Sequence, residues 1–283
     1  MISSSSVTEV RSDPAADAVH TPGDQRRRMP TGGVWQRFVA ANKRICHNVL
    51  QPRLYAMSHI TALMWWFSHH VPRQTRPGAL LEFGSGSEFP LSRLLGQHFA
   101  RQFATYIEAP PPSTIPDGVD FRICVPGKPL PFETGSIDAV VIRSVLEHVS
   151  DPRATFREID RVLAPGGRVF LNLPNKWDYV SVLARLMGPF KSAVLQGLTR
   201  PSWEDFPVFY RCNTKRALRR ALSGTGLQLD LFRPWPSEPS YLKFFVPFYV
   251  AGAVYQFVIS VVGLDLLQPA FIAILRKQPG GER

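Results

Sequence analysis

The sequence predicts an α/β fold in which a largely parallel β-sheet is flanked by helices. Short apolar segments alternate with helical patterns along residues 79–173, as they do in consecutive β–α units. The first apolar segment, residues 79–83, runs into a turn that contains Gly84 and Gly86, and helical periodicity resumes at residues 90–95. With 283 residues, the chain is long enough for one large domain or two modest ones with a sizeable core.

The glycine turn places free backbone amides and a helix N-terminus beside the end of a strand. Gly84 and Gly86 can adopt conformations, and allow ligand approaches, that a side chain would obstruct. The dinucleotide fingerprint G-x-G-x-x-G would need a third glycine at position 89, which is Phe89. The turn is therefore either an ordinary strand-to-helix connection or the binding loop of another cofactor.

The remaining elements follow from periodicity and from helix start and stop signals. Further strands are predicted at residues 103–107, 119–125, 138–143, 168–173, 227–232 and 271–275. Helices are predicted around residues 35–45, 54–70 and 177–190, after the N-cap Asp151 with Pro152, and after the capping residues Asn213 and Thr214. The Pro-Gly-Gly sequence at residues 165–167 is expected to end the helix that starts at Pro152.

Two motifs in this α/β region carry a family resemblance. The order acid-x-Gly-x-Gly at residues 82–86 resembles motif I of class I S-adenosylmethionine-dependent methyltransferases. The run from Ile-Asp-Ala-Val-Val through Leu-Glu-His-Val to Arg-Val-Leu-Ala-Pro-Gly-Gly-Arg-Val is similar to the methyltransferase type 11 family. This resemblance spans about residues 80–174. It implies a Rossmann-like, seven-stranded sheet in the order 3-2-1-4-5-7-6, with the last strand antiparallel.

The resemblance also implies S-adenosylmethionine as the cofactor and names residues that would bind it. Glu82 would help to orient the methionine part, and the backbone at Gly84 and Gly86 would pass close to the cofactor. Glu108 follows the second strand about twenty residues beyond the turn, where a carboxylate can accept hydrogen bonds from both ribose hydroxyls. Pro126 stands where the family often has an acidic residue near adenine, so backbone groups there are expected to contact the base.

Candidate catalytic and acceptor-binding residues lie beyond the fourth strand. An imidazole such as that of His148, next to Glu147, could take a proton from the acceptor. In the family that the chain resembles, this histidine more often belongs to the scaffold of the loop. Residues 203–211 combine aromatic and charged side chains, and either shape the acceptor pocket or simply pack as a loop. The candidate acceptor contacts there are Glu204, Asp205, Tyr210 and Arg211.

Composition divides the chain into a tail and one domain. Residues 1–33 are rich in Ser, Pro, Asp and Arg and are expected to be disordered, whereas residues 34–283 are expected to form a single methyltransferase domain. Its predicted parts are basic and aromatic helices at 34–76, the cofactor-binding core at 80–174, an acceptor-side cap at 175–212, and an apolar insertion at 241–266.

The charge distribution predicts an anionic partner. The net charge is +11, and no Asp or Glu occurs from residue 25 to residue 81, which favours either nucleic acid or an acidic membrane surface. No Asn-Pro-Pro-Tyr or Asp-Pro-Pro-Tyr sequence follows the fourth strand, so a nucleic-acid substrate is less favoured.

Residues 244–264 contain no charged side chain. As one helix they would extend about 31 Å, but a single membrane span would separate the last strand from its sheet. A helical hairpin or an oblique helix in one leaflet, a cover over the pocket mouth, and a buried core helix all remain open.

Three hypotheses about function follow. The first is a methyltransferase that acts on a lipid or other hydrophobic small molecule, with a possible anionic membrane surface as partner. The second is an RNA methyltransferase that uses the basic arm, and the third is a non-catalytic module with a cofactor-binding fold. The three cysteines are far apart, which disfavours a disulfide framework or a metal site and favours a cytoplasmic location. The acid-free basic arm and the uncharged segment at residues 244–264 together predict a peripheral position on the inner face of the membrane as the alternative within that compartment.

Overall fold

The computed structural model describes residues 33–179, 182 and 207–279. Most of the predicted helix at 177–190, together with Glu204 and Asp205, lies outside these residues. By its internal contacts the chain divides into two units, Met1–Arg37 and Phe38–Arg283. The second unit contains the whole sheet described below.

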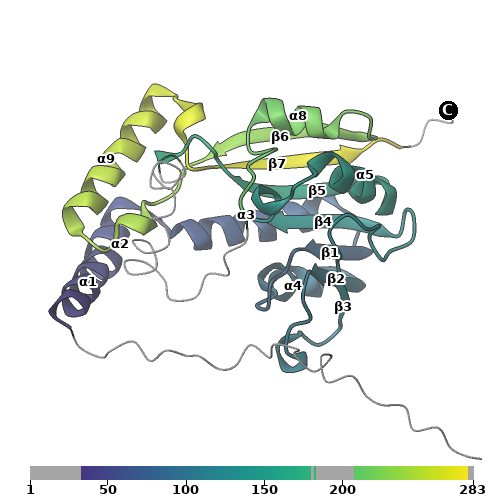
Figure 1. The fold of residues 1–283 in the computed structure, drawn as a ribbon, viewed down its shortest axis with the longest axis horizontal. Coiled ribbons are helices and arrows are strands. Elements are labelled where there is room, and N and C mark those ends of the chain that lie inside the picture. Colours follow the sequence, from purple (N-terminus) through teal and green to yellow (C-terminus); the bar gives the residue numbers. More distant parts are fainter. Residues whose placement is uncertain (1–32, 180–181, 183–206, 280–283) are drawn as a thin grey trace, which may run out of the picture. The chain divides into compact units, whose positions relative to one another are not determined.

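The described residues form one seven-stranded sheet in the order β3-β2-β1-β4-β5-β7-β6 (Figure 1). The strands are β1 (Ala79–Phe83), β2 (Arg101–Tyr106), β3 (Val119–Ile123), β4 (Ile137–Arg143), β5 (Leu163–Pro174), β6 (Leu227–Trp235) and β7 (Ala270–Lys277). Strands β1 to β5 pair in parallel, and β7 runs antiparallel to both of its neighbours. The predicted fold class, strand order and antiparallel last strand are confirmed.

The described helices are α1 (Val34–Ile45), α2 (Gln51–Leu54), α3 (His59–Gln74), α4 (Pro90–Leu95), α5 (Pro152–Val162), α8 (Lys215–Leu222) and α9 (Val246–Val262). Helices α3 and α4 cover one face of the sheet, and α5 and α8 cover the other. Since side chains alternate along a strand, Leu80 of β1 packs with α3 and α4, while its neighbour Leu81 packs with α5 and α8. The sheet is therefore the middle of three layers, and its buried strands explain the continuous apolar segments in the sequence.

Local capping signals in the sequence act as predicted. The Asp151 carboxylate accepts a hydrogen bond of 3.0 Å from the Ala154 amide at the start of α5. The Thr214 hydroxyl accepts one of 3.2 Å from the Ala217 amide at the start of α8. Each cap satisfies an amide that has no partner within its helix.

The predicted start of α3 is wrong by five residues. Residues 54–70 were expected to be helical, but α3 begins at His59. The Ser58 hydroxyl accepts a 3.1 Å hydrogen bond from the Thr61 amide and starts the helix there, whereas Tyr55 is extended. A local cap thus overrides the apolar periodicity that extends further back.

The predicted boundary at residues 165–167 is also wrong, because β5 begins at Leu163, ahead of the Pro-Gly-Gly sequence. Ile137 of β4 pairs with Leu163, whereas Ala139, two residues later, pairs with Arg168. The intervening residues of β5 bulge out of the ladder, and a bulge accommodates the proline and glycines inside a strand.

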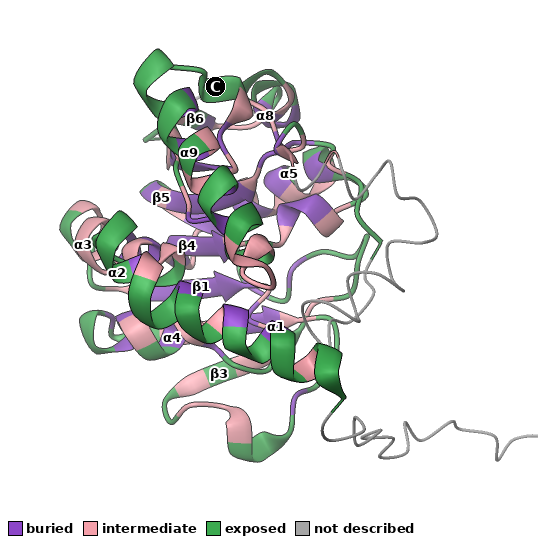
Figure 2. Ribbon diagram, turned by 90° about the vertical axis from the view of Figure 1, so that its left-hand side faces the viewer, coloured by how far each residue is buried: buried purple, intermediate pink, exposed green. Residues whose placement is uncertain are grey.

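Helix α9 lies beyond the carboxyl ends of the parallel strands, on the left of Figure 1. It is one helix of 17 residues, not a hairpin, and it ends at Gly263 with a φ of 76°. Among the residues that the structure describes, no helix is both long and apolar enough to cross a membrane. Figure 2 looks onto this side of the molecule, where most of the outer surface of α9 is exposed. The alternative of a buried core helix is therefore wrong for most of its length.

Candidate cofactor and acceptor site

The glycine turn after β1 is tied to the end of β2. The amides of Gly84 and Ser85 each donate a 2.9 Å hydrogen bond to the Thr105 carbonyl. Both glycines have positive φ, 77° at Gly84 and 61° at Gly86, which favours glycine over other residues. Their surroundings differ, because a Cβ at Gly84 would lie 2.5 Å from Val145, whereas one at Gly86 would meet nothing within 4 Å. Gly84 permits close packing, and Gly86 leaves open space above the loop.

Glu82 fixes the helix that follows this loop. Its carboxylate accepts hydrogen bonds from the Leu91 amide at 3.1 Å, the Ser92 amide at 2.7 Å and the Ser92 hydroxyl at 2.6 Å. Glu82 is 3% exposed, and this burial raises its pKa, against the hydrogen bonds and the positive charge of Arg143. The residue before α4, Phe89, has a φ of 50° and provides no side-chain cap, so Glu82 takes over that role.

Glu108 is exposed just beyond the end of β2. Because Phe83 pairs with Thr105, the glycine turn and Glu108 follow neighbouring strand ends at the same edge of the sheet. The next loop is tied to the same edge, since the Cys124 amide donates a 2.8 Å hydrogen bond to the Tyr106 carbonyl. The structure therefore brings the predicted ribose ligand and the glycine turn to one side of the molecule.

The loop after β4 contains a buried acid. Glu147 is 7% exposed, and its Oε2 atom has no hydrogen-bond partner. Burial raises the pKa of this carboxyl to about 7. The Glu147 backbone carbonyl accepts hydrogen bonds from the Phe209 amide at 2.7 Å and the Tyr210 amide at 3.2 Å. Those bonds attach the segment after residue 206 to the loop after β4.

His148 lies at the surface of the same loop. Its Nδ1 is 3.1 Å from the Pro207 carbonyl oxygen, and its Nε2 is 4.0 Å from Oε1 of Glu147. A carbonyl can only accept, so the neutral ring carries its proton on Nδ1 and a lone pair on Nε2. This tautomer suits a general base. Of the other predicted acceptor contacts, Tyr210 is held against this loop, and the Arg211 guanidinium donates to the Ser150 carbonyl.

No sequence motif pointed to the polar groups that meet on the α3 side of this edge. Arg143 ends β4, and its positive charge lowers the pKa of both Glu82 and His59. Glu238 follows β6 and is 7% exposed, and its negative charge raises the pKa of Tyr55 and of His59. The only available signal was composition, since Glu238 is an isolated acid just ahead of a long uncharged segment. Within the described parts of the chain, no group of three or more His, Cys, Asp or Glu could hold a metal ion.

Comparison with known proteins identifies the central part of the chain. Residues 81–171 match the model of a family described as a methyltransferase domain, which confirms the family resemblance. A ubiquinone biosynthesis O-methyltransferase of Xanthomonas oryzae pv. oryzae is 41% identical over 123 residues, which cover 41% of this chain and 48% of that protein. The ubiquinone/menaquinone biosynthesis C-methyltransferase UbiE of Desulfotalea psychrophila is 28% identical over 114 residues, covering 36% and 45%.

The aligned part spans about half the length of these curated relatives. Among solved structures, geranyl diphosphate C-methyltransferase from Streptomyces coelicolor is 17% identical with a TM-score of 0.49, and the match covers 88% of this chain and 86% of that one.

Proposed function

We propose that this protein, whose residues 81–171 form an S-adenosylmethionine-dependent methyltransferase domain, transfers a methyl group to a hydrophobic small-molecule acceptor. The observation that carries the proposal is this domain match on a sheet with the order 3-2-1-4-5-7-6, with the glycine turn at its carboxyl edge. The matching relatives are named as O- and C-methyltransferases of ubiquinone biosynthesis, which favours a hydrophobic acceptor over nucleic acid.

The residues at the turn fit the cofactor. S-adenosylmethionine supplies, when bound, an electrophilic methyl group on its sulfonium. The open space above Gly86 allows a ligand to approach the backbone, and the exposed Glu108 carboxylate can accept hydrogen bonds from a ribose. Glu82 holds α4 in place through its hydrogen bonds and thereby also fixes the glycine turn, which lies between Glu82 and α4.

Methyl transfer from a sulfonium depends mainly on alignment and on the exclusion of water. A base is needed only for an acceptor that must lose a proton. His148 has the tautomer of a base, and Glu147 lies beside it in the same loop. We therefore assign His148 the role of candidate proton acceptor, which assists the transfer without being indispensable.

We further propose that the acceptor is taken from a membrane surface. Several apolar residues on α9 are more than half exposed, namely Val254, Phe257, Val261 and Val262. The exposed Arg44 and Arg53 belong to the acid-free stretch of the chain, and Lys243, at the foot of α9, bonds to Gln51 of α2. An apolar helix face beside basic groups fits an anionic bilayer. Each basic residue near the bilayer strengthens the free energy of membrane binding by about 1 kcal/mol, and the burial of apolar side chains adds a contribution that salt does not screen.

Cofactor binding is tested by calorimetric titration with S-adenosylhomocysteine. We expect a dissociation constant in the micromolar range, which corresponds to a binding free energy of about −8 kcal/mol. The acceptor is then sought by incubating the protein and labelled S-adenosylmethionine with membrane extracts. If millimolar ligand gives neither heat nor thermal stabilisation, the non-catalytic hypothesis replaces this proposal.

Membrane association is tested by sedimentation with anionic liposomes. We expect co-sedimentation that weakens at high salt and is lost in the variant with Phe257→Ser and Val261→Ser. The matched control is Ile123→Ser, which removes an exposed apolar side chain from β3. β3 is the edge strand opposite β6, and α9 connects β6 to β7. Protein that stays in the supernatant at low salt but binds RNA with steep salt dependence would favour the RNA hypothesis instead.

A further inference from the structure

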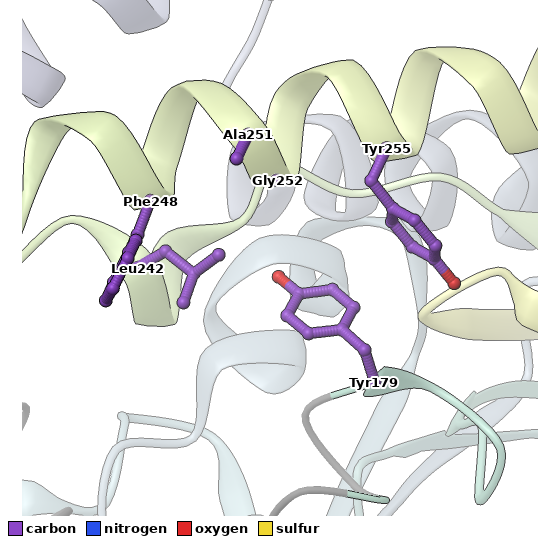
Figure 3. A pocket seen from close by; sticks show the side chains of 6 residues that line it. All are labelled: Tyr179, Leu242, Phe248, Ala251, Gly252 and Tyr255. Atoms are coloured by element: carbon purple, nitrogen blue, oxygen red, sulfur yellow. The ribbon is translucent and has the colours of Figure 1, made fainter.

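Two cavities of similar volume differ in their chemistry. The cavity along α9, of about 300 Å³, has apolar walls apart from two tyrosine hydroxyls (Figure 3), and it is lined by Tyr179, Leu242, Phe248, Ala251, Gly252 and Tyr255. The other cavity, of about 290 Å³, lies between α5 and α8, and three of the residues that line it are Arg153, Arg211 and Arg220. This second cavity, the arginine pocket, therefore suits a negatively charged ligand.

The three arginines come from different segments that are packed together. Arg153 is in the first turn of α5, Arg220 is in α8, and Arg211 lies in the segment ahead of α8. Helices α5 and α8 share one apolar cluster, to which Phe156 and Leu218 belong. The positions of the arginines are thus set by the packing of two helices against each other.

Arg211 is held in a fixed orientation at the pocket. Its guanidinium donates a hydrogen bond to the carbonyl of Ser150, which also lines the pocket. Its Cζ atom lies 5.5 Å from the centre of the Phe209 ring, where the face of the ring attracts a cation. A guanidinium has five N–H donors. The bond to Ser150 therefore leaves donors of Arg211 for a ligand.

No ion pair within the described residues neutralises the three arginines. The acids of α5 are engaged elsewhere. Glu158 pairs with Arg161 at 2.8 Å, and Asp160 accepts a 2.8 Å hydrogen bond from the Gly226 amide. The pocket thus keeps its positive charge.

Asp151 is the acid that lines the pocket. Its carboxylate accepts a 3.0 Å hydrogen bond from the Ala154 amide, and its carbonyl accepts one of 3.2 Å from the Thr155 amide. Since these bonds cap the first turn of α5, the arginines rather than free amides are the groups that can hold a ligand. Three arginines against one carboxylate leave the lining with two positive charges, and a cleft lined by one sign of charge concentrates counter-ions.

We infer that the arginine pocket binds a phosphomonoester. The guanidinium fork matches the geometry of phosphate oxygens, which it bonds in pairs. A phosphomonoester carries a charge of about −1.5 to −2 at neutral pH, which balances the charge of the lining. Ala217 and Ala221 add small apolar side chains to the wall, against which the group that bears the phosphate lies.

The size and place of the pocket define the ligand further. A volume near 290 Å³ is at the lower end for small-molecule sites, which fits a phosphate with one small group attached. The phosphate belongs either to a soluble molecule or to the headgroup of a phosphatidate lipid. None of the residues that line the pocket belongs to the glycine turn, so the site exists whether or not the proposed function is correct.

Binding is tested by calorimetric titration of the full chain with phenyl phosphate, at an ionic strength of about 0.15 M to screen general attraction between surface charges. We expect saturable binding of one molecule per chain. Phenyl sulfate has the same shape with a single negative charge, and we expect it to bind more weakly.

Paired variants assign the binding to the pocket. Arg220→Gln should weaken phenyl phosphate binding by at least about tenfold, because charge-assisted hydrogen bonds are lost. Arg219→Gln is the matched control. It removes the same charge from the next residue of α8, which is exposed and does not line the pocket, and it should change the affinity by less than about twofold.

A second pair on α5 guards against a folding defect in α8. Arg153→Gln should weaken binding, whereas Arg157→Gln, at an exposed position outside the pocket, should not. Within the described residues, the side chains of Arg153 and Arg220 take part in no hydrogen bond or ion pair, so we expect both variants to fold, as urea denaturation will check.

Vesicles of phosphatidylcholine with phosphatidate identify the source of the phosphate. If Arg220→Gln co-sediments with them less than Arg219→Gln does, the site takes the lipid headgroup. If the two variants co-sediment alike but differ in phenyl phosphate binding, it takes a soluble phosphomonoester. Absence of saturable phenyl phosphate binding, equal affinity for phenyl sulfate, or equal effects within both variant pairs overturns the inference.

Discussion

The buried carboxyl of Glu147 predicts an unusual dependence of stability on pH. Burial raises its folded-state pKa from 4.5 to about 7, while the unfolded chain retains the ordinary value. The folded protein therefore holds a proton that the unfolded chain has released between these two pH values. The stabilisation is fully present below pH 4.5 and is lost as the pH rises towards 7.

The size of this effect follows from the raised pKa. Each pKa unit corresponds to 1.36 kcal/mol, so complete ionisation costs the fold about 3 kcal/mol as an upper value. Glu147→Gln keeps the shape of the side chain and cannot ionise. We expect the variant and the natural protein to be similarly stable at pH 4.5, and the variant to be more stable at pH 7.5 by up to this amount.

The measurement is urea denaturation of both proteins at four pH values from 4.5 to 7.5. The matched control is Glu133→Gln, which makes the same substitution at an exposed glutamate ahead of β4. Parallel curves for the natural protein and Glu147→Gln would refute the reasoning, because they would mean that the carboxyl titrates alike in the folded and unfolded states.

Three further predictions concern the turn and the candidate base. Gly86→Ala should abolish S-adenosylhomocysteine binding in calorimetry. The control is Gly118→Ala, because Gly118 also has a positive φ and open space around it but lies ahead of β3. This control should lower the stability of the fold by a similar amount and leave binding intact. Ser92→Ala removes the 2.6 Å bond to Glu82 and should lower the free energy of unfolding by about 1 to 3 kcal/mol in urea, with no change expected if the bond is absent. His148→Ala should lower turnover only modestly in the labelled-cofactor assay, and a loss of about a thousandfold with unchanged cofactor affinity would make His148 an essential base.

Where glycine and capping signals bracket an element, the sequence predicts its limits well. β1 at residues 79–83 and α4 at residues 90–95 have the predicted bounds because the glycine turn separates them. The boundary errors at α3 and β5 have local causes that periodicity does not contain. One is the cap from Ser58, and the other is a bulge in the pairing of β4 with β5.

The candidate site was predictable only where its residues follow strand ends. The glycine turn and Glu108 could be placed together because neighbouring parallel strands end at one edge. The bond from Lys243 to Gln51 joins residues 192 positions apart, and nothing in either local sequence indicates that they meet. The role of Glu82 in holding α4 was hidden for a related reason, since it depends on how the first turn of the helix folds back over the strand.

The features that cost stability collect at the carboxyl edge of the sheet. The described residues include three non-glycine residues with positive φ, and these are Phe89 after β1, Ser144 after β4, and Tyr210, whose amide bonds to the loop after β4. Each such conformation costs on the order of 1 to 3 kcal/mol. Glu147, in the loop after β4, adds a buried carboxylate oxygen without a hydrogen-bond partner. Strained backbone of this kind is typical of functional sites, and these residues lie at the edge of the sheet where the glycine turn lies, which agrees with the proposed cofactor and acceptor site.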